Sequence, residues 1–236
     1  MRAVIMAGGR GSRLAPYTTV LPKPLMPLSD RPIVDVILRQ LVAAGCTEVV
    51  ISVGHLGSLI ESWIREEGKY GVPVSFVYED EPLGTAGALG KIAPSDRPFL
   101  ALNGDILTTL PFAELLAAQE ESSGIATVAV KTRTVSIEYG VVELSPERSI
   151  VGLREKPQLE YLVSMGVYAF APSITGLIGP GERIDFPDLL LRAREHGHDV
   201  KGHVFDGYWR DIGNHDDYEA AISEFADAPE RFIGGG

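Results

Sequence analysis

Short apolar runs alternate with stretches of amphipathic periodicity along the first half of the chain. A continuous apolar run predicts a strand that is buried on both faces of a sheet. Ile33, Ile37 and Leu41 recur at helical spacing, and Asp30 with Pro32 predicts the start of that helix as cap and first-turn proline. The predicted strands cover residues 3–7, 49–53, 74–78 and 99–102, and the predicted helices cover residues 33–42 and 59–64.

The pattern becomes less regular beyond residue 125. We interpret this half as completing the same sheet and adding a small antiparallel section. Strands separated by amphipathic helices indicate an α/β fold with a doubly wound, mostly parallel, Rossmann-like sheet. We expect one domain over residues 1–228 and a tail over 229–236 that is frayed from residue 233. Later elements are predicted as strands at 125–130, 141–144 and 163–170 and as helices at 186–195 and 217–225.

Two polar segments follow predicted strands directly. One is the glycine-rich segment from Gly8 to Leu14, and the other is Asn103-Gly104-Asp105. In doubly wound sheets, ligands bind beyond the carboxyl ends of the strands. We therefore expect both segments to contribute to one binding site.

The glycine-rich segment suits a polyphosphate, because glycines let backbone N–H groups approach it closely. Arg10, Arg13 and the proline-flanked Lys23 add positive charge. A dinucleotide-binding fingerprint requires a third glycine where Leu14 stands, and no Walker lysine-serine pair follows. An ordinary surface loop with turn glycines remains the alternative.

Composition narrows the classes of partner. The net charge of −11 disfavours general nucleic-acid binding, which requires clustered cations. Cys46 is the only cysteine, which excludes an internal disulfide and fits a reducing compartment. The chain has no signal-peptide pattern and no apolar run long enough to span a bilayer. We therefore expect a cytoplasmic protein with neither nucleic-acid nor membrane partners.

A series of motifs in fixed order resembles the signature of the sugar-phosphate nucleotidylyltransferases, also called nucleotide-sugar pyrophosphorylases. The series begins with Gly-Gly-x-Gly-x-Arg-Leu and Lys-Pro and continues over most of the chain. The further motifs are residues 81–87, 103–105, 139–142, 155–157, 166–168 and 208–213. Each is modest alone, and their common order makes the resemblance specific.

The resemblance implies a nucleotidyltransferase fold and transfer of a nucleotide from a nucleoside triphosphate to a sugar 1-phosphate. It implies Arg13, Lys23 and Asp105 as catalytic residues and a Mg²⁺ cofactor held by Asp105 and Asp211. The implied nucleotide-binding residues are Ala7, Gly8, Gly9, Gly11, Glu81, Gly84, Thr85, Asn103 and Gly104. The implied sugar-phosphate-binding residues are Tyr139, Gly140, Glu155, Lys156 and Gly166.

The form of residues 81–87 is similar to that of guanylyltransferases acting on mannose- or heptose-type phosphates. Uridylyl-, cytidylyl- or thymidylyltransferase activity and a catalytically silent nucleotide-sugar-binding subunit remain alternatives. Relatives suggest a possible homo-oligomer. His196 with His198 and His215 with nearby aspartates resemble metal ligands, but we interpret both groups as helix termini, with Asn214 as a helix cap.

Overall fold

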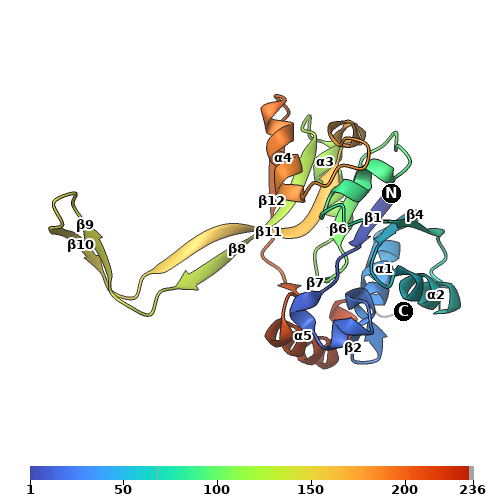
Figure 1. Ribbon diagram of the computed structural model, residues 1–236, viewed down its shortest axis with the longest axis horizontal. Coiled ribbons are helices and arrows are strands. Elements are labelled where there is room, and N and C mark those ends of the chain that lie inside the picture. The colour runs from blue at the N-terminus through green and yellow to red at the C-terminus, as the bar shows by residue number, and fades with distance from the viewer. Residues whose placement is uncertain (68, 234–236) are drawn as a thin grey trace.

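The computed structural model describes residues 1–67 and 69–233, so residues 234–236 of the expected frayed tail lie outside the described residues. A seven-stranded sheet in the order β12-β8-β11-β6-β1-β4-β5 forms its centre (Figure 1). Only β11 runs antiparallel to its neighbours, which confirms the predicted mostly parallel sheet. The strands are β1 (Arg2–Ala7), β4 (Glu48–Val53), β5 (Val74–Tyr78), β6 (Phe99–Asn103), β8 (Ala126–Ser136), β11 (Gln158–Phe170) and β12 (Val200–Val204).

Helices cover both faces of the sheet, because successive side chains of a buried strand point to opposite sides. Ala3 and Ile5 of β1 belong to one apolar core, and Val4 between them belongs to the other. The first core contains α1 (Ile33–Ala43), α2 (Gly57–Glu67), α3 (Phe112–Glu120) and α5 (His215–Asp227). The second contains α4 (Phe186–Glu195) and the 3₁₀ helices η4 (Gly87–Lys91) and η5 (Pro172–Leu177). This arrangement confirms the doubly wound fold.

The structure differs from the sequence prediction at four helices, of which α2 extends beyond the predicted residues 59–64 at both ends. Helix α3 was not predicted, because alanines dilute the periodicity of its buried Phe112, Leu115 and Leu116. Asp30 does not cap α1: the chain forms the short strands β2 (Pro27–Leu28) and β3 (Arg31–Pro32), and the helix begins at Ile33 without a side-chain cap. Helix α5 is longer than predicted and begins at His215.

Strands β8 and β11 continue far beyond the sheet as a two-stranded ribbon (Figure 1). At its tip, β9 (Val141–Leu144) pairs with β10 (Ile150–Arg154) in antiparallel register. We call residues 131–163 the arm and the remainder the body. The arm is the predicted antiparallel section. Its strands β8 and β11 are longer than expected, because they stay paired with each other beyond the apolar segments that are buried in the sheet.

Among the described residues, no helix has both the length and the apolar character needed to cross a bilayer.

Candidate active site

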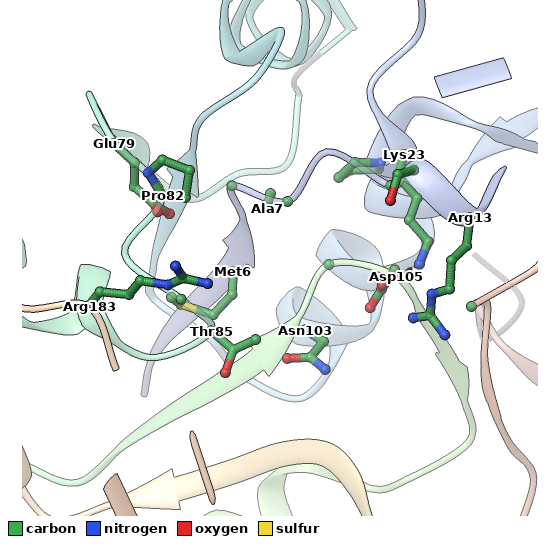
Figure 2. Close-up of a pocket in the computed structure, with 18 residues that line it drawn as sticks. Met6, Ala7, Arg13, Lys23, Glu79, Pro82, Thr85, Asn103, Asp105 and Arg183 are labelled. Carbon is green, nitrogen blue, oxygen red and sulfur yellow. Dashed lines mark hydrogen bonds and ion pairs between the residues drawn. The ribbon is translucent and has the colours of Figure 1, made fainter. Parts of the chain in front are cut away.

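A cleft of about 370 Å³ lies at the carboxyl ends of β1 and β6 (Figure 2). Its size is typical of small-molecule sites, and its position agrees with the prediction for a doubly wound sheet. The two polar segments predicted to meet do so here, because β1 and β6 are parallel neighbours and Gly104 N donates to Met6 O at 2.9 Å. The wall is completed by Glu79, Pro82, Gly84, Thr85 and Arg183.

The glycine-rich loop is held in one conformation. Gly11 has φ +63°, and a Cβ there would lie 2.9 Å from Thr18 Cγ2 and 3.3 Å from Lys23 Cβ. Thr18 Oγ1 donates to Gly11 O at 2.9 Å, and Leu14 N donates to the same oxygen at 2.8 Å. Both the left-handed backbone and the close contacts require glycine at this position. The backbone of the loop at Gly11 is therefore held close to Thr18 and Lys23.

Lys23 and Asp105 form the charged centre of one end of the cleft. The Lys23 side chain is buried, with the residue 7% exposed, and its Nζ pairs with Asp105 Oδ2. Asp211 lies beside them because β7 (Ile106–Thr108) pairs with β13 (Trp209–Asp211) and Ile212 N donates to Asp105 O at 3.0 Å. Burial raises the pKa of Asp211, and the charge of Asp105 raises it further, against the opposing effect of Lys23 and Arg13. Two carboxylates and two cations thus converge from separate segments.

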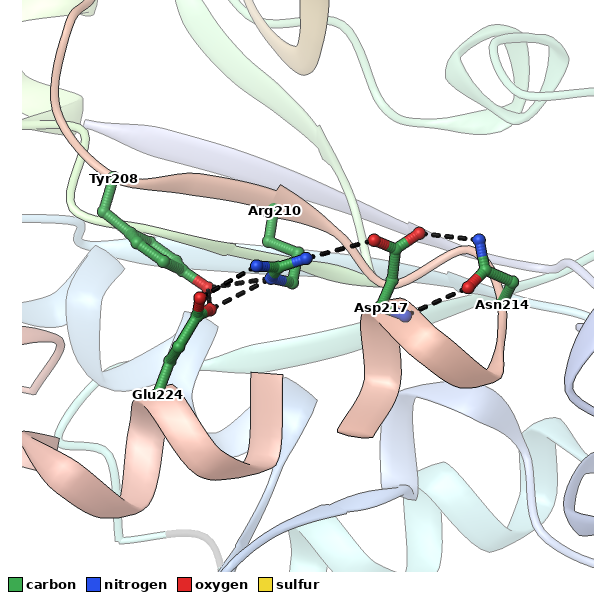
Figure 3. A network of polar contacts seen from close by, with 5 residues as sticks. All are labelled: Tyr208, Arg210, Asn214, Asp217 and Glu224. Carbon is green, nitrogen blue, oxygen red and sulfur yellow. Dashed lines mark hydrogen bonds and ion pairs between the residues drawn. The ribbon is translucent and has the colours of Figure 1, made fainter. Parts of the chain in front are cut away.

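A network of charged groups fixes β13, which carries Asp211 (Figure 3). The Arg210 guanidinium donates to Glu224 Oε1 at 2.8 Å and Oε2 at 3.0 Å, and to Asp217 Oδ1 at 3.1 Å. These bonds hold the Glu224 pKa below its usual range and join the strand to helix α5. Asn214 Oδ1 accepts from Asp217 N at 3.0 Å, which confirms Asn214 as the predicted helix cap.

Glu79 and Arg183 lie at the opposite end of the cleft from Lys23 and Asp105 (Figure 2). Glu79 Oε1 accepts from Ser52 Oγ at 2.6 Å, and its Oε2 accepts from Leu83 N at 3.0 Å. These bonds hold the carboxylate in place. Neither residue is among those predicted from the sequence to form the site.

The two omissions have different origins. Glu79 directly follows a predicted strand. Its place at the carboxyl end of that strand could therefore have predicted that it lies at the site. Arg183 has no such local signal. Backbone bonds between Ile184 and the 83–86 segment bring it to the cleft.

The structure brings most of the expected nucleotide site together, but not the expected sugar-phosphate site. Glu81 is exposed and does not line the cleft, although its neighbour Pro82 does. Gly166 lies under Asn103, where its φ of +71° and a 2.6 Å approach of any Cβ to Asn103 Nδ2 require glycine. The predicted residues that line the cleft are Ala7, Gly8, Gly9, Gly11, Arg13, Lys23, Gly84, Thr85, Asn103, Gly104 and Asp105.

The other four predicted sugar-phosphate residues lie on the arm, outside the cleft. Tyr139 is 78% exposed, and a Cβ at Gly140 would lie 3.1 Å from Glu155 Oε2. Lys156 has φ +42°, an uncommon conformation for a residue with a side chain. These four residues therefore gather near the base of the β9–β10 hairpin and remain a prediction as a binding site.

Two of the three histidines considered as metal ligands, His196 and His215, have other partners. His196 ends helix α4, where its Nδ1 lies 2.9 Å from Arg192 O, and His215 Nε2 lies 2.9 Å from Ala15 O. No group of three or more His, Cys, Asp or Glu residues is arranged to hold a metal within residues 1–67 and 69–233.

Comparisons with known proteins give consistent matches. A family model described as nucleotidyl transferase matches residues 2–228. The mannose-1-phosphate guanyltransferase of Schizosaccharomyces pombe is 34% identical over 232 residues, covering 92% of this chain and 62% of that protein. The UTP–glucose-1-phosphate uridylyltransferase of Synechocystis is 31% identical over 242 residues, covering 94% and 62%. The chain thus spans 62% of the length of these relatives.

Solved structures share the fold. HddC from Yersinia pseudotuberculosis superposes with a TM-score of 0.73 at 23% identity, covering 95% of this chain and 99% of that chain. HddC complexed with GMP-PN superposes with a TM-score of 0.70 at 22% identity and the same coverage.

Proposed function

The chain belongs to the nucleotidyl transferase family, and we propose that it transfers a nucleoside monophosphate from a nucleoside triphosphate to a sugar 1-phosphate. A phosphate oxygen of the sugar attacks the α-phosphorus, and the bond to the β-phosphate breaks to release pyrophosphate. The observation that carries this proposal is the convergence of the glycine-rich loop, Lys23 and Asp105 on one cleft, with Asp211 held next to Asp105 by the pairing of β13 with β7.

The charged end of the cleft suits the triphosphate. Transfer at phosphorus depends on alignment and on neutralising negative charge more than on a protein nucleophile. The loop offers backbone N–H groups, and the exposed Arg13 guanidinium is free of ion pairs among the described residues. Lys23 is buried and held by Asp105, so its charge has a fixed position next to the reacting phosphate. In this proposal Arg13 binds the outer phosphates and Lys23 stabilises charge at the α-phosphate.

Asp105 and Asp211 fit a Mg²⁺ ion. Two like charges held side by side, one with a raised pKa, are stabilised by a cation between them. Mg²⁺ prefers oxygen ligands and is held by one or two carboxylates together with substrate phosphates, so two aspartates suffice. When bound, the ion would neutralise phosphate charge and help align both substrates.

The other end of the cleft fits a nucleobase, and we propose guanine. The Watson–Crick edge of guanine presents two adjacent N–H donors, which the fixed Glu79 carboxylate can accept together. Uracil and thymine present one N–H between two carbonyl oxygens, which a carboxylate repels. The S. pombe relative is a guanyltransferase, whereas the Synechocystis relative is a uridylyltransferase, so Glu79 is the stronger argument. The proposal of a mannose-type sugar is supported only by the names of relatives such as the S. pombe guanyltransferase.

The overall activity is tested by pyrophosphate release with Mg²⁺ and a panel of nucleoside triphosphates and sugar 1-phosphates. We expect release with GTP and a mannose-type 1-phosphate, and no release with any pair would reject the proposal. Asp105→Asn should lower turnover at least about 100-fold without unfolding the protein. Asp96→Asn, an exposed aspartate before β6, is the matched control and should retain full turnover.

Base selection is tested separately with Glu79→Gln. Glutamine keeps the shape but offers one acceptor and one donor, so the preference for GTP over UTP should fall at least about tenfold. Asp80→Asn changes an adjacent carboxylate whose side chain is 93% exposed and should leave the preference unchanged. An unaltered GTP:UTP ratio in Glu79→Gln would reject the base assignment while leaving the transferase proposal intact.

A further inference from the structure

Arg13 is a cation of the cleft whose place no counter-ion fixes. Its side chain lies at the end of the cleft that holds Lys23 and Asp105 (Figure 2). Lys23 pairs with Asp105, whereas the Arg13 guanidinium forms no ion pair with any described residue. A Cβ at Gly213 would lie 3.3 Å and 3.5 Å from the two terminal nitrogens of Arg13, so the guanidinium rests against the backbone of Gly213. The position of Arg13 therefore depends on that surface and on the backbone that carries it.

Helix α5 holds the segment that follows the glycine-rich loop. His215, the first residue of the helix, places its Nε2 2.9 Å from Ala15 O. A carbonyl oxygen only accepts hydrogen bonds, so Nε2 carries the proton and is the donor. The Tyr218 hydroxyl donates to Pro27 O at 2.8 Å. The two bonds therefore tie α5 to points on either side of Lys23 in the sequence.

Aromatic packing supports the direction of the His215 side chain. The Tyr17 ring centroid lies 5.8 Å from that of His215 at 57° and 6.3 Å from that of Tyr218 at 59°. Tilted aromatic pairs at such distances attract each other through their quadrupoles. Asn214 caps the helix, which fixes the place of His215 in the first turn. The imidazole is therefore directed toward Ala15 by packing as well as by its hydrogen bond.

The short segment between β13 and α5 joins the glycine-rich loop to Asp211. A Cβ at Gly213 would lie 3.2 Å from Asp211 Oδ2, so the backbone that rests against Arg13 also lies against this carboxylate. The bonds from Arg210 to α5 hold the same segment from its other side. The separation of Arg13 from Asp211 is therefore set by the way α5 holds the loop.

We propose that His215 is a positioning residue that fixes Arg13 where the outer phosphates bind. This inference rests on the proposed function, in which Arg13 binds those phosphates. His215 is exposed and does not line the cleft, so it acts through Ala15 rather than on a substrate. Without its bond, the backbone that carries Arg13 would keep the contacts of Gly11 and lose its hydrogen bond to α5. Arg13 would then sample more positions, which lowers the affinity for the outer phosphates.

The reverse reaction isolates the outer phosphates. In it, a pyrophosphate oxygen attacks the nucleotide phosphorus of the nucleotide sugar, and the bond to the sugar phosphate breaks. Pyrophosphate then occupies the place of the outer phosphates. His215→Ala should raise the KM for pyrophosphate about fivefold, which is the contribution of one net hydrogen bond, and leave the KM for the nucleotide sugar unchanged. In the forward direction the KM for the nucleoside triphosphate should rise, with kcat and the KM for the sugar 1-phosphate unchanged.

Two further variants separate positioning from a general defect. His215→Gln keeps an N–H donor near Ala15 O and should recover most of the affinity for pyrophosphate. His198→Ala removes an exposed histidine beyond the end of α4 and should behave as the wild type. A folding defect would instead lower kcat and change the KM values of both substrates together.

Calorimetric titration with pyrophosphate and Mg²⁺ makes the same comparison without turnover and should show binding weakened about fivefold in His215→Ala. Three results would overturn the proposal: unchanged pyrophosphate binding in His215→Ala, an equal rise in the KM of both substrates, or a His215→Gln variant as weak as His215→Ala. With an active wild type, each of these would leave the proposed function standing. A wild type that turns over in neither direction would reject that function, and the calorimetric comparison would then decide the role of His215 alone.

Discussion

Replacing Arg210 with methionine is expected to destabilise the protein and to weaken its response to Mg²⁺. Arg210 lies on β13 next to Asp211, and its side chain is 26% exposed. It joins the strand to α5 through two bonds to Glu224 and one to Asp217 (Figure 3). Methionine fills similar volume but makes none of these bonds. Asp211 would then lose the link from its strand to α5 and would keep only the contacts of β13 with β7 and its neighbours.

The size of the effect follows from the three bonds. Hydrogen bonds to charged groups contribute about 1.5–3 kcal/mol each when well shielded. The Glu224 and Asp217 side chains are 38% and 32% exposed, so solvent screening reduces each contribution well below that range. We expect a total loss of about 2–3 kcal/mol, which corresponds to a decrease in Tm of about 4–12 °C for a chain of this size.

The pH dependence separates the ion pair from a packing defect. Arg210 holds the pKa of Glu224 below its usual 4.5 in the folded protein. A depressed carboxylate pKa contributes stability that is present above the unfolded value and is lost as pH falls through the folded value. The difference in stability between the wild type and Arg210→Met should therefore narrow below about pH 4.5.

Thermal unfolding at pH 7 and pH 3.5, with a Mg²⁺ titration of turnover at pH 7, measures these effects. The half-saturating Mg²⁺ concentration should rise in Arg210→Met. Arg65→Met is the matched control, because Arg65 forms an exposed i,i+4 pair with Glu61 and should change stability by at most about 0.5 kcal/mol. A Tm within 2 °C of the wild type, or a Tm loss that is equal at both pH values, would refute the reasoning.

Three further predictions concern the loop and two polar contacts. Gly11→Ala should raise the KM for the nucleoside triphosphate about tenfold, because the φ of +63° at this position strains an alanine. Steady-state kinetics measures this change, and an unchanged KM would contradict a rigid loop. Tyr70→Phe should lower the free energy of unfolding by about 1–2 kcal/mol with kcat unchanged, because buried Asp35 Oδ1 loses a 2.7 Å bond, and urea denaturation measures this loss. Arg192 lowers the pKa of Glu182 to about 2, so Glu182→Gln should be less stable than the wild type at neutral pH and converge with it as acid titrates that group.

Local pattern predicted the sheet well and the helices less completely. The four apolar runs of the first half became β1, β4, β5 and β6. A strand buried on both faces must be apolar throughout, which accounts for β1, β4 and β6, whereas β5 is a partly exposed edge strand. Helix α3 was missed because its alanines give no clear apolar face, and its burial is decided by packing against β8 and β11. The length of β8 and β11 was missed for a related reason. Beyond residue 130 their pairing depends on each other rather than on an apolar core.

The sequence by itself determined the motifs and the chemistry of the charged end of the cleft. Gly11, Lys23 and Asp105 were named from their neighbours along the chain, and the parallel order of β1 and β6 brought them together. Only the tertiary structure decided that Glu79 and Arg183 face the same cleft, and that Glu155 and Lys156 leave it on the arm. Periodicity and motif spacing are properties of one segment, whereas the distance between segments is fixed by packing.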